Sequence, residues 1–121
     1  MKFLATTAAS RGLMTGLKNA AGIIDDVLDY VQFSVNEQCV EYDECDTFEG
    51  FSNASKPVFH IEYPAGDADT TISTFNQTTV NKYCDIGIDS GADAFNTVIK
   101  YMNLSGWVQY CDDRTYVTDG F

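Results

Sequence analysis

Basic residues are scarce in this chain, and so is histidine. Its 121 residues include 7 Lys and Arg, 18 Asp and Glu and 1 His, which gives a formal net charge of −11 at pH 7. Binding to a phosphate backbone depends on clustered Lys and Arg side chains, so we expect no nucleic-acid partner. An acidic surface favours a cationic or neutral partner, although acidity also serves solubility alone.

The chain also lacks long apolar runs and the common metal and nucleotide motifs. No run approaches the roughly 20 apolar residues of a membrane-spanning helix, so we expect no membrane span. There is no C-x-x-C pair and His60 is the single histidine, which leaves little support for a metal site. No glycine-rich phosphate-binding motif follows a predicted strand, and we therefore expect no cofactor.

Apolar residues are nevertheless plentiful. They make up 45% of the sequence and aromatic residues 13%, which is too much for a disordered acidic tail. A compact domain usually has about 100–200 residues. No linker interrupts the pattern, so residues 1–121 are interpreted as a single region that ends in a polar C-terminal tail at 112–121.

Four cysteines favour an oxidising compartment. They are Cys39, Cys45, Cys84 and Cys111. Four cysteines allow three pairings, which a sequence alone cannot distinguish. Cys39 and Cys45 enclose only five residues and would close a local loop, which leaves Cys84 to pair with Cys111. Free buried thiols are the alternative.

Three N-x-Ser/Thr sequons point to the secretory pathway, where each can accept a glycan. They begin at Asn53, Asn76 and Asn103. The first residues do not resemble a convincing signal peptide, because Thr6 and Thr7 interrupt a short apolar segment. An extracellular location is therefore expected from the cysteines and the sequons.

Apolar periodicity predicts strands that alternate with helices. Strands are predicted at 13–17, 31–35, 58–63 and 107–111, and helices at 2–10, 21–30, 47–52 and 92–102. Residues 65–90 are polar and are predicted to form a long surface excursion. Such alternation implies parallel strands joined by right-handed crossovers. The predicted fold class is α/β, either an open doubly wound sheet or part of a (β/α)8 barrel.

Polar residues gather at the carboxyl ends of the predicted strands. They are Lys18 and Asn19, Asn36 and Glu37, His60 and Glu62, and Gln109. Folds of this class place their functional sites at these strand ends. We therefore expect function at this edge of the sheet.

Three of these strand ends carry longer motifs, and a fourth motif follows near the C-terminus. They are Gly16–Asn19 (GLKN), Val35–Cys39 (VNEQC), Phe59–Pro64 (FHIEYP) and Leu104–Cys111 (LSGWVQYC). In this order they resemble the C-terminal half of glycoside hydrolase family 114, the endo-α-1,4-polygalactosaminidases, in a fungal-type form. The resemblance extends over nearly the whole chain.

The resemblance implies a (β/α)8 TIM-barrel enzyme that hydrolyses galactosamine-containing polysaccharide with two carboxylates. It assigns the four predicted strands to strands five to eight, a partial barrel of about four βα units. An export signal and a catalytic aspartate would then lie upstream of Met1. The alternatives are a non-catalytic carbohydrate-binding or interaction module derived from the same barrel, and an open α/β domain unrelated to sugars.

The resemblance marks Glu37 as a catalytic residue. Glycoside hydrolysis usually needs one carboxyl group to protonate the leaving oxygen and a second to attack or to activate water. A general acid/base role for Glu37 requires a pKa raised by burial or by a neighbouring carboxylate. The alternative is a solvated loop glutamate.

The remaining strand-end residues are candidates for substrate binding. They are Lys18, Asn19, Asn36, His60 and Glu62. Lys18 can pair with Glu37, either as a structural salt bridge or within the substrate site. His60 and Glu62 share one face of their strand, which we expect to be the barrel interior, with the covering helices facing Phe59, Ile61 and Tyr63. A buried His–Glu pair that holds the barrel mouth together is the alternative.

An acidic loop follows the catalytic candidate. Six carboxylates lie within the thirteen positions from Glu37 to Glu49. Their order does not match a calcium-binding loop, so no calcium site is predicted. We expect this loop to attract a cationic, galactosamine-rich polysaccharide. Self-association through the exposed edges of a partial barrel is a further candidate interaction.

Overall fold

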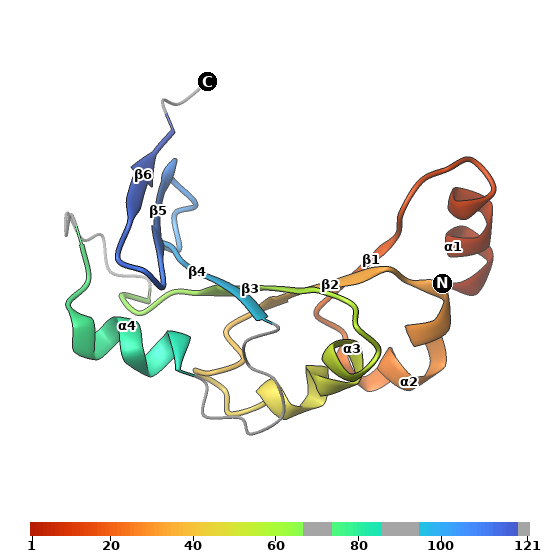
Figure 1. The fold of residues 1–121 in the computed structure, drawn as a ribbon, viewed down its shortest axis with the longest axis horizontal. Coiled ribbons are helices and arrows are strands. Elements are labelled where there is room, and N and C mark those ends of the chain that lie inside the picture. The colour runs from red at the N-terminus through yellow and green to blue at the C-terminus, as the bar shows by residue number, and fades with distance from the viewer. Residues whose placement is uncertain (67–73, 86–94, 119–121) are drawn as a thin grey trace.

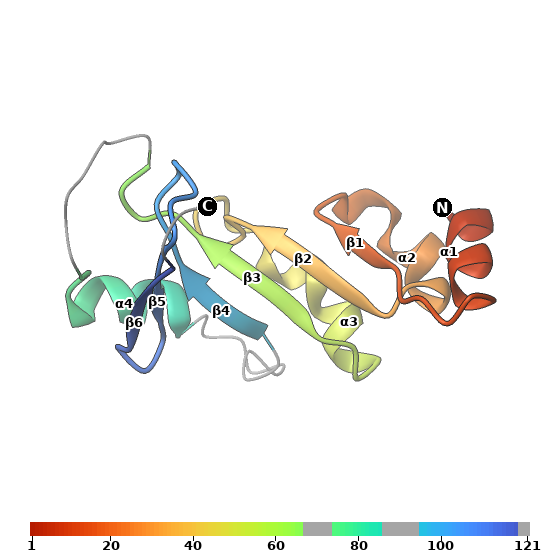
Figure 2. The same ribbon diagram turned by 90° about the horizontal axis from the view of Figure 1, so that it is seen from above.

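A single sheet joins the strands of this protein. A computed structural model describes residues 1–66, 74–85 and 95–118. Within them six strands form one sheet, in the same order as in the sequence (Figures 1 and 2). The strands are β1 (Gly16–Lys18), β2 (Phe33–Glu37), β3 (Val58–Glu62), β4 (Phe95–Ile99), β5 (Trp107–Tyr110) and β6 (Thr115–Val117).

Short helices connect the strands. The described α-helices are α1 (Lys2–Ala9), α2 (Ile24–Val27), α3 (Glu49–Asn53) and α4 (Gln77–Cys84), and three 3-10 turns lie at Ala21–Ile23, Leu28–Tyr30 and Cys45–Phe48. Figure 1 shows α2, α3 and α4 on one side of the sheet. We call this side of β1–β4 the helix-covered face and the opposite side the open face.

The strands β1 to β4 are parallel, and the alternation of strands and helices predicted the first three of them. Val35 of β2 pairs with Phe59 of β3, and Ile61 of β3 pairs with Val98 of β4. The carboxyl ends of these strands therefore lie at one edge of the sheet, where Figure 2 shows their arrowheads. Strand β5 is antiparallel to β4, and β6 is antiparallel to β5.

The helix predicted at 92–102 is wrong, because the described part of that segment contains β4. Its residues alternate between buried and exposed, with Phe95, Thr97 and Ile99 buried and Asn96 exposed. The apolar residues of this segment fit either period, and pairing with the edge of β3 favours the strand. The segment predicted as the fourth parallel strand is instead the antiparallel strand β5.

Other predicted bounds also differ from the structure. The excursion predicted at 65–90 includes α4, whose first turn is capped because the Asn76 Oδ1 accepts a 3.0 Å hydrogen bond from the Thr79 N–H. The strand predicted at 13–17 begins only at Gly16, since Leu13 and Met14 are exposed. The polar segment 112–121 includes β6, whose three residues are all exposed. Residues 67–73, 86–94 and 119–121 lie outside the described residues.

The core lies beneath the helix-covered face. One cluster joins the sheet to α2, to α3 and to the segment between β2 and α3, and its largest fully buried members are Phe48, Phe51, Val31 and Val58. Burying a side chain of this size stabilises the fold by about 1.5–3 kcal/mol. A second cluster joins α4 to β4 and β5 through Val80, Ile99 and Trp107.

Two disulfides close the chain as the spacing suggested. Cys39 and Cys45 form one bond and Cys84 and Cys111 the other. The first closes the loop that follows β2, and the second ties the end of α4 to the residue after β5. Among the described residues, no helix is both long and apolar enough to cross a membrane.

Candidate active site

Glu37 is the last residue of β2 and points to the open face. Burial alternates along this strand, with Ser34 and Asn36 buried against the helix-covered face and Val35 and Glu37 half-buried on the other. Because successive strand side chains point to opposite faces, this alternation fixes the direction of Glu37. The carboxylate therefore lies at the strand-end edge, on the side that a closed barrel would turn inward.

Three neighbours hold Glu37 in place. The Lys18 Nζ lies 2.8 Å from the Glu37 Oε2, and the Tyr63 hydroxyl donates a 3.0 Å hydrogen bond to the Glu37 Oε1. The Glu37 backbone N–H donates a 3.0 Å hydrogen bond to the Asn19 Oδ1. Each carboxylate oxygen thus has one donor, and the contacts come from the ends of β1 and β3, the two strands that flank β2.

Local backbone geometry brings Asn19 to this position. Its φ of 52° lies in the left-handed region, which Asn tolerates better than most residues. The chain turns sharply after β1, and the Asn19 side chain faces the end of β2. Gln38 has a φ of 64° and turns the chain in the same way directly after Glu37.

The neighbours of Glu37 also set its protonation. The hydrogen bond from Lys18 lowers the pKa of Glu37 below its ordinary value, and the Tyr63 hydroxyl acts in the same direction. Burial, together with the nearby Glu37 carboxylate, raises the pKa of Tyr63 to about 12. Among the described residues the pKa of Glu37 is thus shifted in the direction opposite to the one that a general acid/base role requires, and the carboxylate is ionised at neutral pH.

His60 and Glu62 lie on the helix-covered face and are fully buried. The predicted orientation of β3 is therefore wrong, because Phe59 is 45% exposed on the open face. The His60 Nε2 lies 2.8 Å from the Glu62 Oε1, and the His60 Nδ1 lies 2.9 Å from the Thr97 Oγ1. The arrangement matches the alternative interpretation, a buried pair beneath the barrel mouth.

This buried pair supports the loop after β2. The Glu62 Oε1 accepts a 2.7 Å hydrogen bond from the Val40 N–H, and the His60 Nε2 lies 3.3 Å from the Cys39 Sγ. Cys39, Cys45 and His60 bring potential metal-ligand atoms within 4.8 Å of one another. Because the two sulfurs are joined in a disulfide, they are not available as thiolate ligands.

Asn36 and Gln109 are buried as well. Asn36 points away from Glu37, and neither polar atom of its side chain has a hydrogen-bond partner among the described residues. The Gln109 side chain binds the backbone of Phe75, where its Oε1 accepts from the N–H at 2.8 Å and its Nε2 donates to the carbonyl at 3.2 Å. Gln109 therefore anchors the segment before α4.

Tyr63 is the residue of this site that the sequence pattern missed. The sequence pattern assigned His60 and Glu62 to the barrel interior. Tyr63, which alternates with them along the strand, was therefore predicted to face the covering helices. The signal was nevertheless present, since Tyr63 follows β3 directly and shares its alternation with Ile61, the residue that pairs with Glu37. A tyrosine next to a carboxylate at a strand end is a natural hydrogen-bond donor.

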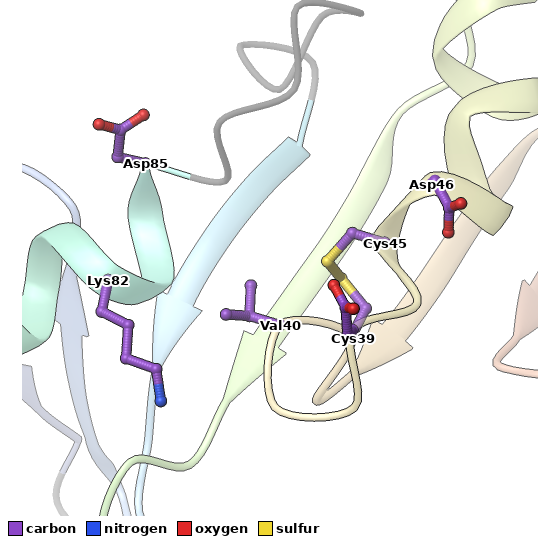
Figure 3. A pocket seen from close by; sticks show the side chains of 7 residues that line it. Cys39, Val40, Cys45, Asp46, Lys82 and Asp85 are labelled. Carbon is purple, nitrogen blue, oxygen red and sulfur yellow. A yellow bond between two sulfur atoms is a disulfide. The ribbon is translucent and has the colours of Figure 1, made fainter.

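Two cavities flank the acidic loop. One has a volume of about 330 Å³ and lies between the Cys39–Cys45 loop and α4, with Lys82 and Asp85 on its helical wall (Figure 3). The other has a volume of about 520 Å³ and is lined in part by Gln38, Tyr63 and Lys82. The larger cavity shares a wall residue with the catalytic candidate, since Tyr63 lines it and contacts Glu37.

The three sequon asparagines are all exposed. The Asn76 Oδ1 caps α4, and the Asn103 Oδ1 accepts a 3.0 Å hydrogen bond from the Ser105 N–H. Both contacts use the side-chain oxygen, whereas a glycan is attached to the side-chain nitrogen. The local structure at Asn76 and Asn103 is therefore compatible with glycosylation.

Comparison with known proteins gives two matches. Residues 1–116 match the sequence model of glycoside-hydrolase family GH114. The fold resembles the crystal structure of Aspergillus fumigatus Ega3 in complex with galactosamine, with a TM-score of 0.79 and 48% sequence identity. This match covers 90% of the present chain and 42% of the Ega3 chain, so the chain spans less than half the length of that relative. No curated protein matches the chain.

Proposed function

Because the chain belongs to glycoside-hydrolase family GH114, we propose that it supplies Glu37 to a secreted enzyme that hydrolyses galactosamine-containing polysaccharide. The family match and the structural likeness confirm the predicted fold class, a partial (β/α)8 barrel. The observation that carries the proposal is the position of Glu37. It ends a parallel strand on the open face and is held by donors from both neighbouring strand ends.

In this proposal Glu37 acts as the general acid/base, and an aspartate outside these 121 residues is the second carboxylate. Lys18 lowers the pKa of Glu37 within the described residues, which opposes an acid role. A second carboxylate close to Lys18 would compete for its ammonium group and repel the charge on Glu37. The acid role therefore depends on a close approach between the two carboxylates.

The other strand-end residues divide into two groups. Lys18 and Asn19 lie beside Glu37, and we assign them to substrate contact and to the orientation of the carboxylate. Asn36, His60 and Glu62 are buried on the opposite face, so we assign them to support of the site from beneath. The buried group holds the loop after β2 through the Glu62 contact with Val40.

The substrate class follows from the relative and from charge. Ega3 is described in complex with galactosamine, and the present chain is 48% identical to it over the matched region. Galactosamine carries a protonated amine at neutral pH, and a net charge of −11 attracts a cationic polymer. We therefore assign a galactosamine-rich polysaccharide to the open face, with no nucleic-acid partner.

The open face itself needs a cover. Phe59 is 45% exposed there and packs edge-on against Phe33, with ring centroids 5.7 Å apart. In a closed barrel this face turns inward and becomes the packed interior. We propose that the other strands of the closed barrel cover the open face. The alternative is that two copies of the isolated chain associate through it.

A chimera tests the catalytic assignment. The chain replaces the matching region of Ega3, and hydrolysis of α-1,4-linked galactosamine oligomers is followed by the release of reducing ends. Glu37→Gln is expected to lower the rate by at least about 100-fold, because general acid–base catalysis contributes roughly 10²–10⁴. Asp25→Asn, which removes one negative charge at an exposed position of α2, is the matched control and should leave the rate unchanged.

The result also separates the two candidate functions. If Glu37→Gln abolishes hydrolysis and leaves oligomer binding intact, the chain is the catalytic half of an enzyme. If the folded chimera binds oligomers but never cleaves them, and Glu37→Gln changes nothing, the chain is a carbohydrate-binding module. Full activity of Glu37→Gln would refute the assignment of this residue.

A further inference from the structure

The larger cavity lies where three parallel strands end. Its volume is about 520 Å³, within the roughly 300–1,000 Å³ that is usual for small-molecule sites. Its walls come from the loop after β2, from the residues that follow β3, from α4 and from Met102, which lies shortly after β4. A cavity at the carboxyl ends of barrel strands is a natural place for a ligand.

Tyr63 joins this cavity to the proposed active site. It lines the cavity and also donates the 3.0 Å hydrogen bond to the Glu37 Oε1. The cavity therefore begins one side chain away from the carboxylate. A polysaccharide cleaved at Glu37 extends on both sides of the scissile bond, so a neighbouring sugar unit can reach this space.

We infer that this cavity is a flanking sugar subsite that selects a neutral, hydroxyl-rich pyranose unit, such as an N-acetylated one, over a unit with a free amine. The inference rests on the proposed function, since it assigns a further subsite to the same enzyme. It differs from a simple electrostatic attraction of cations to the acidic surface.

The lining of the cavity suits a sugar ring. Tyr42, Tyr63 and Tyr83 contribute aromatic rings with apolar faces, and the Tyr63 and Tyr83 hydroxyls are already bonded to Glu37 and Glu41. The Gln38 amide supplies both donors and an acceptor for sugar hydroxyls. Rings and neutral hydrogen-bonding groups together recognise a hydroxyl-rich, uncharged ligand.

The charge of the cavity wall is already balanced. Glu41 is the acidic residue of the lining, and its Oε2 accepts a 2.9 Å hydrogen bond from the Tyr83 hydroxyl and lies 3.7 Å from the Lys82 Nζ. The Lys82 Nζ also donates a 3.1 Å hydrogen bond to the Tyr83 hydroxyl. The hydrogen bond with Tyr83 and the charge of Glu41 raise the pKa of Lys82, which stays protonated at neutral pH.

A sugar ammonium in this cavity would therefore meet Lys82, which already pairs with Glu41, the carboxylate that the ammonium would otherwise bind. It would have to displace Lys82 from Glu41 or accept repulsion from it. A neutral unit meets neither cost. Among the described residues, both contacts of the Glu41 carboxylate are made by Oε2. Its Oε1 is therefore available to accept a hydrogen bond from a sugar hydroxyl.

The test is a binding measurement on the full chain. N-acetylgalactosamine and galactosamine are titrated separately, and the backbone amide signals of Gln38 and Tyr63 are followed by NMR. We expect both signals to shift and N-acetylgalactosamine to bind about threefold more tightly, the ratio that a partly screened charge interaction supports. Stronger binding of galactosamine, or no shift of either signal, would overturn the inference.

A charge substitution sharpens the test. Lys82→Gln leaves Glu41 without its cation and is expected to reverse the preference, so that galactosamine binds more tightly. Lys2→Gln on α1 makes the same change of net charge outside the cavity lining and should leave the ratio as it is. Equal effects of the two substitutions would refute the role of Lys82, provided that both variants show the dispersed spectrum of the folded chain.

Glu37→Gln distinguishes this inference from the proposed function. The substitution should abolish hydrolysis in the Ega3 chimera while leaving the binding preference in the cavity unchanged. If the chain prefers N-acetylgalactosamine but Glu37→Gln does not change hydrolysis by the chimera, the proposed function alone is refuted. A chimera that depends on Glu37 but prefers galactosamine in the cavity would refute the subsite alone.

Discussion

The ion pair between Lys18 and Glu37 should contribute a measurable, pH-dependent part of the stability. The Lys18 Nζ lies 2.8 Å from the Glu37 Oε2, and the two side chains are 59% and 28% exposed. A double-mutant cycle isolates this contact, with Lys18→Met and Glu37→Gln as single variants and their combination as the fourth corner. Both substitutions remove charge while keeping most of the side-chain volume.

Solvent screening sets the magnitude of the coupling. Exposed ion pairs typically contribute about 0.2–1 kcal/mol. The short contact and the partial cover of Glu37 favour the upper half of this range, so we expect about 0.5–1 kcal/mol. With a urea m-value of roughly 1–2 kcal/mol per molar, this corresponds to a midpoint difference of about 0.5 M.

The coupling should disappear in acid. The folded state lowers the pKa of Glu37 below its ordinary value of 4.5, which means that folding favours the ionised carboxylate. The stabilisation is complete above that ordinary value and is lost as the pH falls through the lower pKa of the folded state. A cycle at pH 7 should therefore give the full coupling, and a cycle well below pH 4.5 should give none.

Urea unfolding followed by tryptophan fluorescence measures all four corners. Trp107 is the single tryptophan, and it is buried against Tyr101 with ring centroids 4.5 Å apart, so its emission reports on unfolding. Lys2→Met on α1 controls for the change in net charge. Zero coupling at pH 7, or the same coupling in acid, would refute this account of the site.

Three further predictions concern Tyr63, a disulfide and a helix cap. Tyr63→Phe should lower the free energy of unfolding by about 1 kcal/mol in urea at pH 7, because one hydrogen bond is lost; an unchanged midpoint would contradict the contact. Replacing Cys84 and Cys111 by Ser should cost about 3.5 kcal/mol in urea, because their bond closes a loop of 27 residues; a cost below about 1 kcal/mol would contradict the pairing. Asn76→Ala should lower the free energy of unfolding by about 1 kcal/mol, because the cap of α4 is lost together with the sequon. Thr78→Ala should remove only the sequon, and gel mobility shows the loss of the glycan in both variants. Equal urea midpoints for the two variants would contradict the cap.

The strand-end grouping of the site could be predicted from the sequence. Lys18 and Glu37 each follow a short apolar segment, and parallel strands in a sheet align their carboxyl ends. The structure brings both residues together at that edge, at 2.8 Å. The pairing of cysteines could be predicted for a similar reason, since a short loop between Cys39 and Cys45 is easily closed.

Sidedness could not be predicted. His60 and Glu62 were expected on the barrel interior because they are polar, whereas the structure buries both against the helices. Polar side chains can be buried when they form hydrogen bonds with one another. Here His60 contacts both Glu62 and Thr97, and the sequence pattern does not reveal these contacts. The same error hid Tyr63, whose ring and hydroxyl reach the open face.

Sequence alone determined the family, the α/β class and the edge at which the functional residues gather, because strand ends and motif order are local features of the chain. Only the tertiary structure decided which face each strand presents, and that Phe95–Ile99 is a strand. A strand has the same alternation whichever face is covered, and only packing against a helix breaks that symmetry. The contacts of Glu37 with Lys18 and Tyr63, and hence the lowered pKa of its carboxyl group, exist only once that choice has been made.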